Sequence, residues 1–223
     1  MSKVKIIEVH ENIFADNIKT ADETRQMLDR LGTTMFNVMS SPGSGKTTTI
    51  SAVINKLKDR YKIAVLDVDI ESDLDAKTVA RNTGVKSVQI HNGGLCHIDA
   101  DMTARSLKSI DPKDYDIIFL ENIGNLVCPA EFDTGSHKNI MLLSLPEGDD
   151  KPLKYPLMFS VADIVVFSKI DTKPAFDFDI EKCKSYIKKL NPKAEFFAVS
   201  AKTGEGIEAL AERLAQETKR EVK

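Results

Sequence analysis

Short apolar runs, rich in β-branched residues, alternate along the chain with longer segments in which apolar residues recur at helical spacing. The run Ile63-Ala64-Val65-Leu66 shows no polar alternation, which is typical of a strand buried on both faces. This pattern predicts strands at residues 34–39, 62–68, 87–90, 116–120, 140–145, 163–167 and 195–199.

Segments of helical length lie between these strands, and one more precedes the first of them. The predicted helices span residues 16–31, 46–60, 75–83, 100–110, 180–190 and 207–219. Regular alternation of strand and helix predicts an α/β fold with a mostly parallel sheet covered by helices on both faces. No internal repeat or linker divides the chain, so we expect residues 1–223 to form one domain with an amphipathic N-terminal helix at 16–31.

Composition and charge exclude several classes of protein function. Hydrophobic residues make up 42% and charged residues 29% of the chain, as in soluble globular proteins. Lys and Arg number 31 against 34 Asp and Glu, a net charge of −3 that argues against general binding to nucleic acid. No apolar run approaches the ~20 residues of a membrane helix, and no signal-peptide pattern opens the chain. We therefore expect a cytoplasmic protein with neither a nucleic-acid nor a membrane partner.

The strongest local motif follows the first predicted strand and opens the next helix. Residues 40–47 read SSPGSGKT, which matches a phosphate-binding loop except that Ser40 replaces the first glycine. In such a loop, backbone N–H groups turn toward phosphate oxygens at the positive end of a helix dipole. A glycine turn that merely caps a helix is the alternative, but the strand–loop–helix context favours a nucleotide.

This motif predicts the three-layer sandwich of a P-loop NTPase. Lys46 is expected to reach the outer phosphates, and the Thr47 hydroxyl is expected to bind Mg²⁺. The nucleotide contacts predicted from the loop are Gly43, Ser44, Gly45, Lys46, Thr47 and Thr48.

Two later segments predict that the base is guanine. SKID at residues 168–171 and SAK at residues 200–202 each follow a predicted strand, and they resemble the NKxD and SAK elements of GTPases. The Asp171 carboxylate can accept hydrogen bonds from the N1–H and the 2-amino group of guanine, a donor pair that adenine lacks.

Two further contacts to the base are expected from the same segments. The Ala201 N–H can donate to guanine O6, and the Lys169 stem can cover one face of the base. Ser168 replaces the usual asparagine, whose amide braces this loop, so we expect weaker affinity for the base.

Acidic residues at the ends of two predicted strands are candidates for binding Mg²⁺ and orienting the attacking water. Asp67 and Asp69 lie two residues apart, and Glu121 opens an ENIG sequence with the layout of a DxxG switch. We expect Asp69 and Glu121 to bind Mg²⁺ with Thr47, whereas Asp67 remains open between a ligand and a structural residue. Asp75 follows in a candidate switch segment. The candidate catalytic residues are therefore Lys46, Asp69, Asp75 and Glu121.

The cysteines point to a second site. An odd count of three, with no secretory signal, argues against a disulfide framework. Cys96-His97 and Cys128 each follow a predicted strand, so their loops share one rim of a parallel sheet. Thiolate and imidazole suit Ni²⁺ or Zn²⁺, but free cysteine is also a common core residue, and spacing alone leaves both interpretations open. Cys183 fits the apolar spacing of its helix and is assigned to the core.

Several segments together resemble the HypB family, the nickel-incorporation GTPases of [NiFe]-hydrogenase maturation. The resemblance lies in the phosphate loop, in the segment around Cys96-His97 and above all in ENIGNLVCPA at residues 121–130. It implies a P-loop GTPase whose nucleotide state controls dimerisation and nickel delivery, with a metal site formed by Cys96, His97 and Cys128. It also implies GTP or GDP, Mg²⁺ and Ni²⁺ or Zn²⁺ as cofactors. The implied partners are a second copy bound in a GTP-dependent homodimer, a nickel-maturation protein and the hydrogenase large-subunit precursor.

Two other functions remain open at this point. A non-enzymatic scaffold could bind nickel or zinc and hold GTP without meaningful turnover, and an ATP-using P-loop enzyme could carry a structural zinc. No cysteine precedes Cys96 and no histidine cluster occurs, so the N-terminal metal-binding segment of some HypB members is not expected. Comparing turnover of GTP and ATP separates these possibilities.

Overall fold

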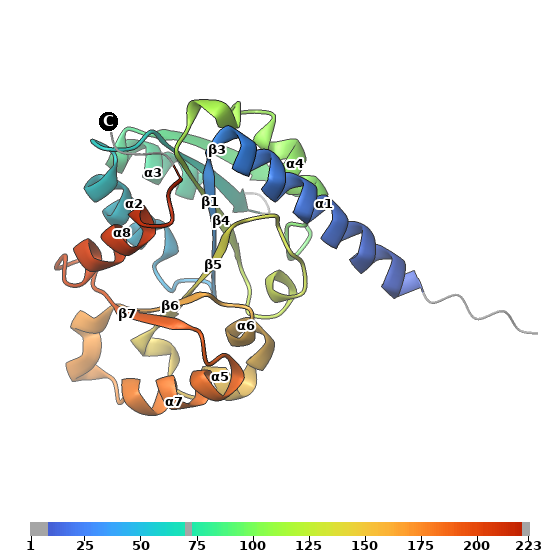
Figure 1. The fold of residues 1–223 in the computed structure, drawn as a ribbon. Coiled ribbons are helices and arrows are strands. Elements are labelled where there is room, and N and C mark those ends of the chain that lie inside the picture. The colour runs from blue at the N-terminus through green and yellow to red at the C-terminus, as the bar shows by residue number, and fades with distance from the viewer. Residues whose placement is uncertain (1–8, 70–72, 220–223) are drawn as a thin grey trace, which may run out of the picture.

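A computed structural model describes residues 9–69 and 73–219, with side chains from Phe14 onward. The described strands form one sheet in the order β3-β2-β4-β1-β5-β6-β7, and every neighbouring pair is parallel (Figure 1). Their bounds are β1 Thr34–Ser40, β2 Ile63–Asp69, β3 Lys86–His91, β4 Ile117–Gly124, β5 Lys138–Ser144, β6 Ile164–Ser168 and β7 Glu195–Ala198. The predicted α/β fold with a parallel sheet is confirmed.

Helices cover both faces of this sheet and make the three predicted layers (Figure 1). On one face α2, α3 and α8 bury their apolar residues against the central strands. On the other face α1 and α4 cover the half that contains β2 and β4, while α6 and α7 cover β5 and β6. Their bounds are α1 Val9–Leu31, α2 Lys46–Leu57, α3 Leu74–Thr83, α4 Ala100–Leu107, α5 Lys151–Lys154, α6 Pro156–Ser160, α7 Ile180–Leu190 and α8 Ile207–Ala215.

Strand β1 shows why the apolar runs lack polar alternation. Phe36 and Val38 belong to the core beneath α2 and α8. Met35 and Met39 belong to the two clusters on the opposite face. All residues of β1 are buried, because a central parallel strand with helices on both sides has no face toward water.

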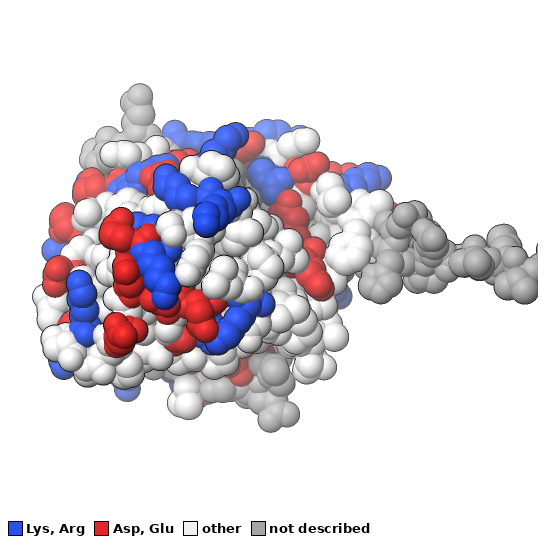
Figure 2. All heavy atoms as spheres, turned by 90° about the horizontal axis from the view of Figure 1, so that it is seen from below, with Lys and Arg blue, Asp and Glu red and all other residues white. Residues whose placement is uncertain are grey.

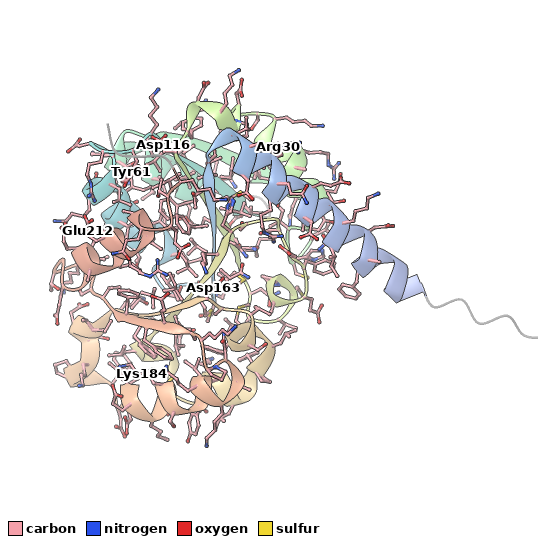
Figure 3. All side chains as sticks on the ribbon, viewed as in Figure 1. Arg30, Tyr61, Asp116, Asp163, Lys184 and Glu212 are labelled. Carbon is pink, nitrogen blue, oxygen red and sulfur yellow. The ribbon has the colours of Figure 1, made fainter. Side chains whose placement is uncertain are left out.

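Two aspartates order the edge of the sheet where the strands begin. Asp116 Oδ2 accepts a hydrogen bond from the Lys62 backbone N–H at 2.8 Å, and Asp163 Oδ2 accepts one from Asn139 N–H at 2.8 Å. Asp116 and Asp163 are labelled in Figure 3. Because these carboxylates satisfy N–H groups where the ladder starts, they help to set the register in which all strands reach the opposite edge.

Strand β4 extends further than predicted, to Gly124 instead of residue 120. Glu121 and Asn122 are both buried within it. Thr47 donates a hydrogen bond to Glu121, and the Asn122 amide donates one to Asn37 at 3.0 Å on the neighbouring strand. The strand can continue through these two polar positions because each side chain finds at least one hydrogen-bond partner on a neighbouring element.

The helices differ from the prediction mainly at their ends. Helix α1 begins at Val9 rather than at residue 16, and its amino-terminal part extends away from the sheet (Figure 1). Helices α5 and α6 were not predicted, because Pro152 and Pro156 suggest loop structure in the sequence. Both prolines occupy the first turn of a helix, where a missing N–H breaks no intrahelical hydrogen bond.

Charged side chains of both signs are interleaved on the part of the surface that carries α5 and α7 (Figure 2). Ion pairs there join Lys154 to Asp150 and Lys184 to Glu181. This face therefore presents no continuous basic patch of the kind that binds nucleic acid. Within the described residues, no helix combines the length and apolar character needed to span a membrane.

Candidate nucleotide and metal sites

The predicted phosphate loop leaves the centre of the sheet, between the end of β1 and the start of α2. Gly45 adopts φ 92°, a left-handed conformation that favours glycine, and it caps α2. At Gly124, a Cβ atom would lie 2.9 Å from Pro42 Cα, so the end of β4 can approach the loop only because this residue has no side chain. The ends of β1 and β4 therefore form one compact unit around the helix N-terminus.

The Lys46 ammonium is held inside this loop. Its Nζ donates to Ser40 Oγ at 2.9 Å, and Ser44 Oγ also donates to Ser40 Oγ, at 2.5 Å. Burial lowers the pKa of Lys46, and this shift is opposed by nearby carboxylates, chiefly Glu121 and Asp75. Ser40, which departs from the usual glycine, thus gives the lysine a hydrogen-bond partner within the loop.

Glu121 and Asp67 lie side by side beneath the loop. They are register partners on β4 and β2, and their exposed fractions are only 1% and 2%. Thr47 Oγ1 donates to Glu121 Oε1 at 2.7 Å. Glu121 Oε2 and Asp67 Oδ2 are buried without any hydrogen-bond partner. A divalent cation beside the Thr47 hydroxyl would satisfy both orphaned oxygens, so the donor set fits Mg²⁺.

The same burial perturbs both carboxyl groups. Desolvation, followed by the charge of Asp67, raises the pKa of Glu121 to about 8. Desolvation, followed by the charges of Asp75 and Asp69, raises the pKa of Asp67 to about 7. Closely spaced acidic groups with raised pKa values are typical of sites that hold a cation or a proton in function.

We expect the chain without nucleotide and Mg²⁺ to lose thermal stability as pH rises from about 5 to about 8. Glu121 and Asp67 hold protons in this window when folded but have released them when unfolded, so the unfolding free energy falls with rising pH. The melting temperature should fall on the order of 5 °C, as measured by calorimetry. Glu121→Gln should flatten the slope, whereas Glu131→Gln on the surface should not. An equal slope of melting temperature against pH in both variants would contradict the assignment of this pH dependence to Glu121.

The other predicted acidic residues occupy less central positions. Asp69 is the last residue of β2, half-buried and in register with His91 on β3. Asp75 lies exposed in the first turn of α3, and its charge reaches Lys46 and Glu121. The structure therefore places Asp67, which the sequence left open, directly beside Glu121. Thr48 is exposed on the first turn of α2.

The two segments expected to bind the base meet each other and the phosphate loop. Ser200 Oγ donates to Asp171 Oδ1 at 2.6 Å, and Ile170 N–H donates to the Val199 carbonyl at 3.2 Å. Ser168 Oγ donates to the Ser44 carbonyl at 2.7 Å. Ser168 thus braces the phosphate loop from the position of the usual asparagine.

Lys169 and Ala201 lie at the edges of this junction. Lys169 has a left-handed backbone with φ 57°, and its Nζ donates to the Gly43 carbonyl at 2.7 Å. Ala201 is half-buried and packs against the core beside α8. The Lys169 stem therefore lies along the phosphate loop.

Glu147 is a further residue at this rim that sequence patterns did not single out as a site residue. Its carboxylate accepts hydrogen bonds from the Ser144 backbone and hydroxyl at 2.8 and 2.6 Å, and from Ser41 Oγ. One glutamate thus ties the end of β5 to the phosphate loop. Sequence spacing offers no signal for this role, because Ser41 and Glu147 are 106 residues apart.

The predicted metal-binding residues are close together at the same rim. Cys96 Sγ and Cys128 Sγ lie 2.7 Å apart, and His97 Nδ1 lies 3.9 Å from Cys96 Sγ. Over residues 9–69 and 73–219, no three His, Cys, Asp or Glu side chains already converge as metal ligands. The two thiols face each other, and the imidazole lies beside them at a longer distance.

The three cysteines differ in environment. Cys96 is exposed and Cys128 half-buried, whereas Cys183 is buried in the core beneath α7. Burial raises the pKa of the Cys183 thiol to about 12, which makes it a poor thiolate donor. Cys96 Sγ donates a hydrogen bond to Cys128 Sγ, and this hydrogen bond raises the pKa of the Cys96 thiol. Of the three, the two rim thiols are the ones accessible to a metal ion.

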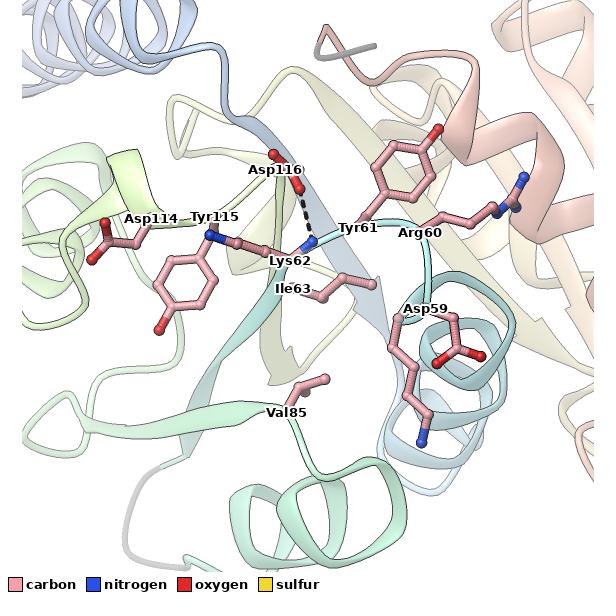
Figure 4. A pocket seen from close by; sticks show the side chains of 10 residues that line it. Asp59, Arg60, Tyr61, Lys62, Ile63, Val85, Asp114, Tyr115 and Asp116 are labelled. Carbon is pink, nitrogen blue, oxygen red and sulfur yellow. Dashed lines mark hydrogen bonds between the residues drawn. The ribbon is translucent and has the colours of Figure 1, made fainter. Parts of the chain in front are cut away.

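A pocket of about 500 Å³ opens at the opposite edge of the sheet. Figure 4 shows its walls, where Tyr61 and Tyr115 flank the start of β2 and the Asp116 carboxylate accepts from the Lys62 backbone. This pocket lies at the amino ends of the strands, whereas ligands of open α/β sheets bind at the carboxyl ends. We therefore place the candidate sites at the rim that carries Lys46 and Cys96.

Comparison with known proteins shows the family. Residues 34–198 match the model of the CobW/HypB/UreG nucleotide-binding domain. The hydrogenase maturation factor HypB of Rhizobium leguminosarum bv. viciae is 42% identical over 209 residues, covering 94% of this chain and 70% of the relative. The probable hydrogenase maturation factor HypB of Methanocaldococcus jannaschii is 38% identical, with 98% and 99% covered.

A solved structure agrees with these relatives. HypB from Helicobacter pylori, crystallised in complex with nickel, superposes with a TM-score of 0.85 at 37% identity, covering 91% of this chain and 94% of that one. The superposition thus extends over nearly the whole chain. The chain therefore belongs to the CobW/HypB/UreG family of P-loop GTPases and, within it, to the HypB hydrogenase maturation factors.

Proposed function

We propose that this chain is a Mg²⁺-dependent GTPase whose slow hydrolysis of GTP controls the binding and delivery of nickel during hydrogenase maturation. The observation that carries the proposal is the course of β4. Its Glu121 lies against Thr47 of the phosphate loop, and seven residues later Cys128 faces Cys96. One strand and its following loop thus connect the nucleotide to the metal donors.

The phosphate end of the site supplies charge and position. Lys46 exchanges its Ser40 partner for the outer phosphates of GTP, and the loop N–H groups surround them. Thr47, Glu121 and Asp67 would hold Mg²⁺, which when bound neutralises phosphate charge. The water that attacks the terminal phosphorus is oriented by one of the acidic residues Asp69, Asp75 and Glu121.

The base end supplies selectivity for guanine. Asp171 is already oriented by the Ser200 hydroxyl, with its second oxygen available to the N1–H and 2-amino donors. Ala201 N–H donates to guanine O6, and the Lys169 stem moves from Gly43 to cover the base. A half-buried carboxylate left without donors makes adenine the costlier base.

The metal end carries nickel as cargo. Cys96, His97 and Cys128 offer two thiolates and an imidazole, a donor set that suits Ni²⁺ and also Zn²⁺. Three donors leave a coordination position open for a transfer partner or for a second copy of the chain. GTP binding favours a homodimer, and nickel then passes to a maturation partner and the hydrogenase large-subunit precursor in the cytoplasm.

Nucleotide and metal affinities should be coupled. We expect the dissociation constant for Ni²⁺ to differ at least about 5-fold between GDP and a non-hydrolysable GTP analogue, because the two nucleotides hold β4 and its loop differently. Competition with a chromophoric chelator measures this affinity, and mass measured in the same samples reports dimerisation. Equal affinities in both nucleotide states would remove the coupling on which the proposal depends.

A matched cysteine control tests the donor set in the same experiment. The Cys96→Ala/Cys128→Ala variant should lose the high-affinity site, whereas Cys183→Ala should retain it, because Cys183 is buried away from the rim. Metal binding that survives the double substitution would return both rim cysteines to a structural role. Turnover of ATP at the rate of GTP would instead support the ATP-using alternative.

A further inference from the structure

The ring of His97 belongs to an aromatic column formed by three separate segments. Phe132, in the loop after Cys128, stacks on His97 with ring centroids 3.9 Å apart and an interplanar angle of 5°. Phe14, on α1, in turn stacks on Phe132, with ring centroids 5.4 Å apart and an interplanar angle of 29°. The N-terminal helix therefore contacts the candidate metal site through two ring faces.

This stack restricts the imidazole without blocking it. The nitrogen lone pairs of a histidine lie in the plane of the ring, whereas Phe132 covers one face of that plane. The edge that carries Nδ1 remains directed toward Cys96 Sγ, 3.9 Å away. A nearly parallel partner at this distance opposes rotation of the ring, and aromatic pairs of this kind contribute beyond simple apolar burial.

A hydrogen-bonded tie on α1 supports the same arrangement. Asn17, with 9% of its surface exposed, accepts from the Ala100 N–H at 2.9 Å and donates to the Asp133 carbonyl at 3.0 Å. Ala100 follows the loop that carries His97, and Asp133 follows Phe132. One amide thus joins the two loops that supply the metal donors.

Arg25, two turns further along α1, strengthens the second loop. It donates to both carboxylate oxygens of Asp133, at 2.9 and 2.8 Å, and to the Ser136 carbonyl at 3.1 Å. The segment between Cys128 and β5 is therefore fixed against α1 at several points. Because His97 stacks on this segment, its ring position depends on α1 as well as on its own loop.

We propose that Phe132 is a positioning residue for the metal site: with Phe14 and Asn17 of α1 behind it, it orients the His97 imidazole toward the Cys96–Cys128 thiol pair. This inference rests on the proposed function, since it assigns His97 as a metal donor. It adds that α1 takes part in metal affinity although it supplies no ligand of its own to this donor set. Phe132 touches no metal and acts only through His97.

The test compares Ni²⁺ affinity of the full-length chain carrying Phe132→Leu, Phe132→Tyr and Phe14→Leu. Leucine keeps the apolar volume but removes the ring face, so Phe132→Leu should weaken binding about 2- to 10-fold. Phe132→Tyr keeps the face and should bind within about 2-fold of the parent chain. Phe14→Leu removes only the outer ring and should have a smaller effect in the same direction, and it serves as the main variant if Phe132→Leu does not fold.

A double-mutant cycle with His97→Ala separates positioning from general stability. If Phe132 acts through His97, Phe132→Leu should change Ni²⁺ affinity little in the His97→Ala background. X-ray absorption should show the imidazole contribution to the nickel ligands reduced in Phe132→Leu, with both sulfur ligands kept. Circular dichroism and GTP affinity check that each variant is folded.

The possible results differ clearly. Unchanged affinity in Phe132→Leu and Phe14→Leu, or an equal loss with and without His97, would overturn the positioning role and leave the proposed function intact. Metal binding that survives Cys96→Ala/Cys128→Ala would instead overturn the proposed function and this inference with it. The inference is supported if Phe132→Leu weakens Ni²⁺ binding only in chains that keep His97, and if Phe132→Tyr binds Ni²⁺ like the parent chain.

Discussion

Replacing Lys46 with methionine should lower kcat for GTP by a factor on the order of 10² to 10³. The ammonium is held in the phosphate loop by Ser40, and it lies among the carboxylates that would surround Mg²⁺. Methionine keeps most of the length of the side chain but removes the charge that the loop directs at the outer phosphates. Loss of one well-placed donor to developing negative charge has an effect of this size in other enzymes. Single-turnover hydrolysis of bound GTP measures it without interference from product release.

A lysine on the same helix provides the control. Lys56 lies exposed in the last turn of α2, where it pairs with Glu208 on α8. Lys56→Met should leave the hydrolysis rate within about 2-fold, because an exposed ion pair of this kind contributes little. If Lys46→Met hydrolyses GTP as fast as Lys56→Met, the phosphate loop does not act in catalysis, and the GTPase proposal fails.

Asp171→Asn should remove most of the preference for GTP over ATP, which we expect to be on the order of 10⁴. The Asp171 carboxylate accepts from Ser200 and has acceptor capacity left for the two donors on the guanine edge. An amide presents an NH₂ group where guanine also presents donors, so the pairing is lost. Competition binding with labelled GDP against GTP and ATP measures the ratio of affinities.

The same substitution should create a new preference. Xanthine carries a carbonyl oxygen where guanine carries its 2-amino group, so the NH₂ group introduced by Asp171→Asn acquires an acceptor, and XTP should gain affinity as GTP loses it. Asp177→Asn, at an exposed position shortly after the same turn, is the matched control and should change neither affinity. An Asp171→Asn protein that still selects GTP would show that another residue reads the base.

The local motifs can be predicted from the sequence with little information about the tertiary structure. Lys46 and Thr47 are adjacent, and a strand before them with a helix after them sets the loop whatever the rest of the chain does. Asp171 was identified in the same way, from a short segment after a strand. Backbone conformation over a few residues depends mainly on those residues, so contiguous motifs can be predicted from sequence.

Contacts between residues far apart in the sequence cannot be predicted from such local patterns. The choice between Asp67 and Asp69 depends on which of them stands opposite Glu121, and that follows from the register of β2 against β4. The brace from Ser168 to the phosphate loop joins residues 124 positions apart. Sequence patterns indicate only a lost asparagine at this position, because the acceptor that the serine finds is not visible along the chain.

The stack of Phe132 on His97 shows the same limit at the candidate metal site. Phe132 looks like an ordinary loop aromatic in the sequence, and α1 looks like a helix that covers the sheet. Only the packing of α1 over two loops brings Phe14, Phe132 and His97 into one column. Cysteine spacing alone likewise left the metal interpretation open, whereas the fold brings Cys96 and Cys128 within 2.7 Å.

The sequence by itself determined the alternation of strands and helices, the phosphate loop, the carboxylate proposed to select guanine and the supply of thiol and imidazole donors. It did so because secondary structure and side-chain chemistry are properties of neighbouring residues. The tertiary structure decided which acidic residue lies beside Glu121, how Ser168 supports the loop and what holds His97 in place. Those contacts depend on strand order, register and helix packing. These features arise from many weak interactions summed over the whole core, so no single segment of the sequence determines them.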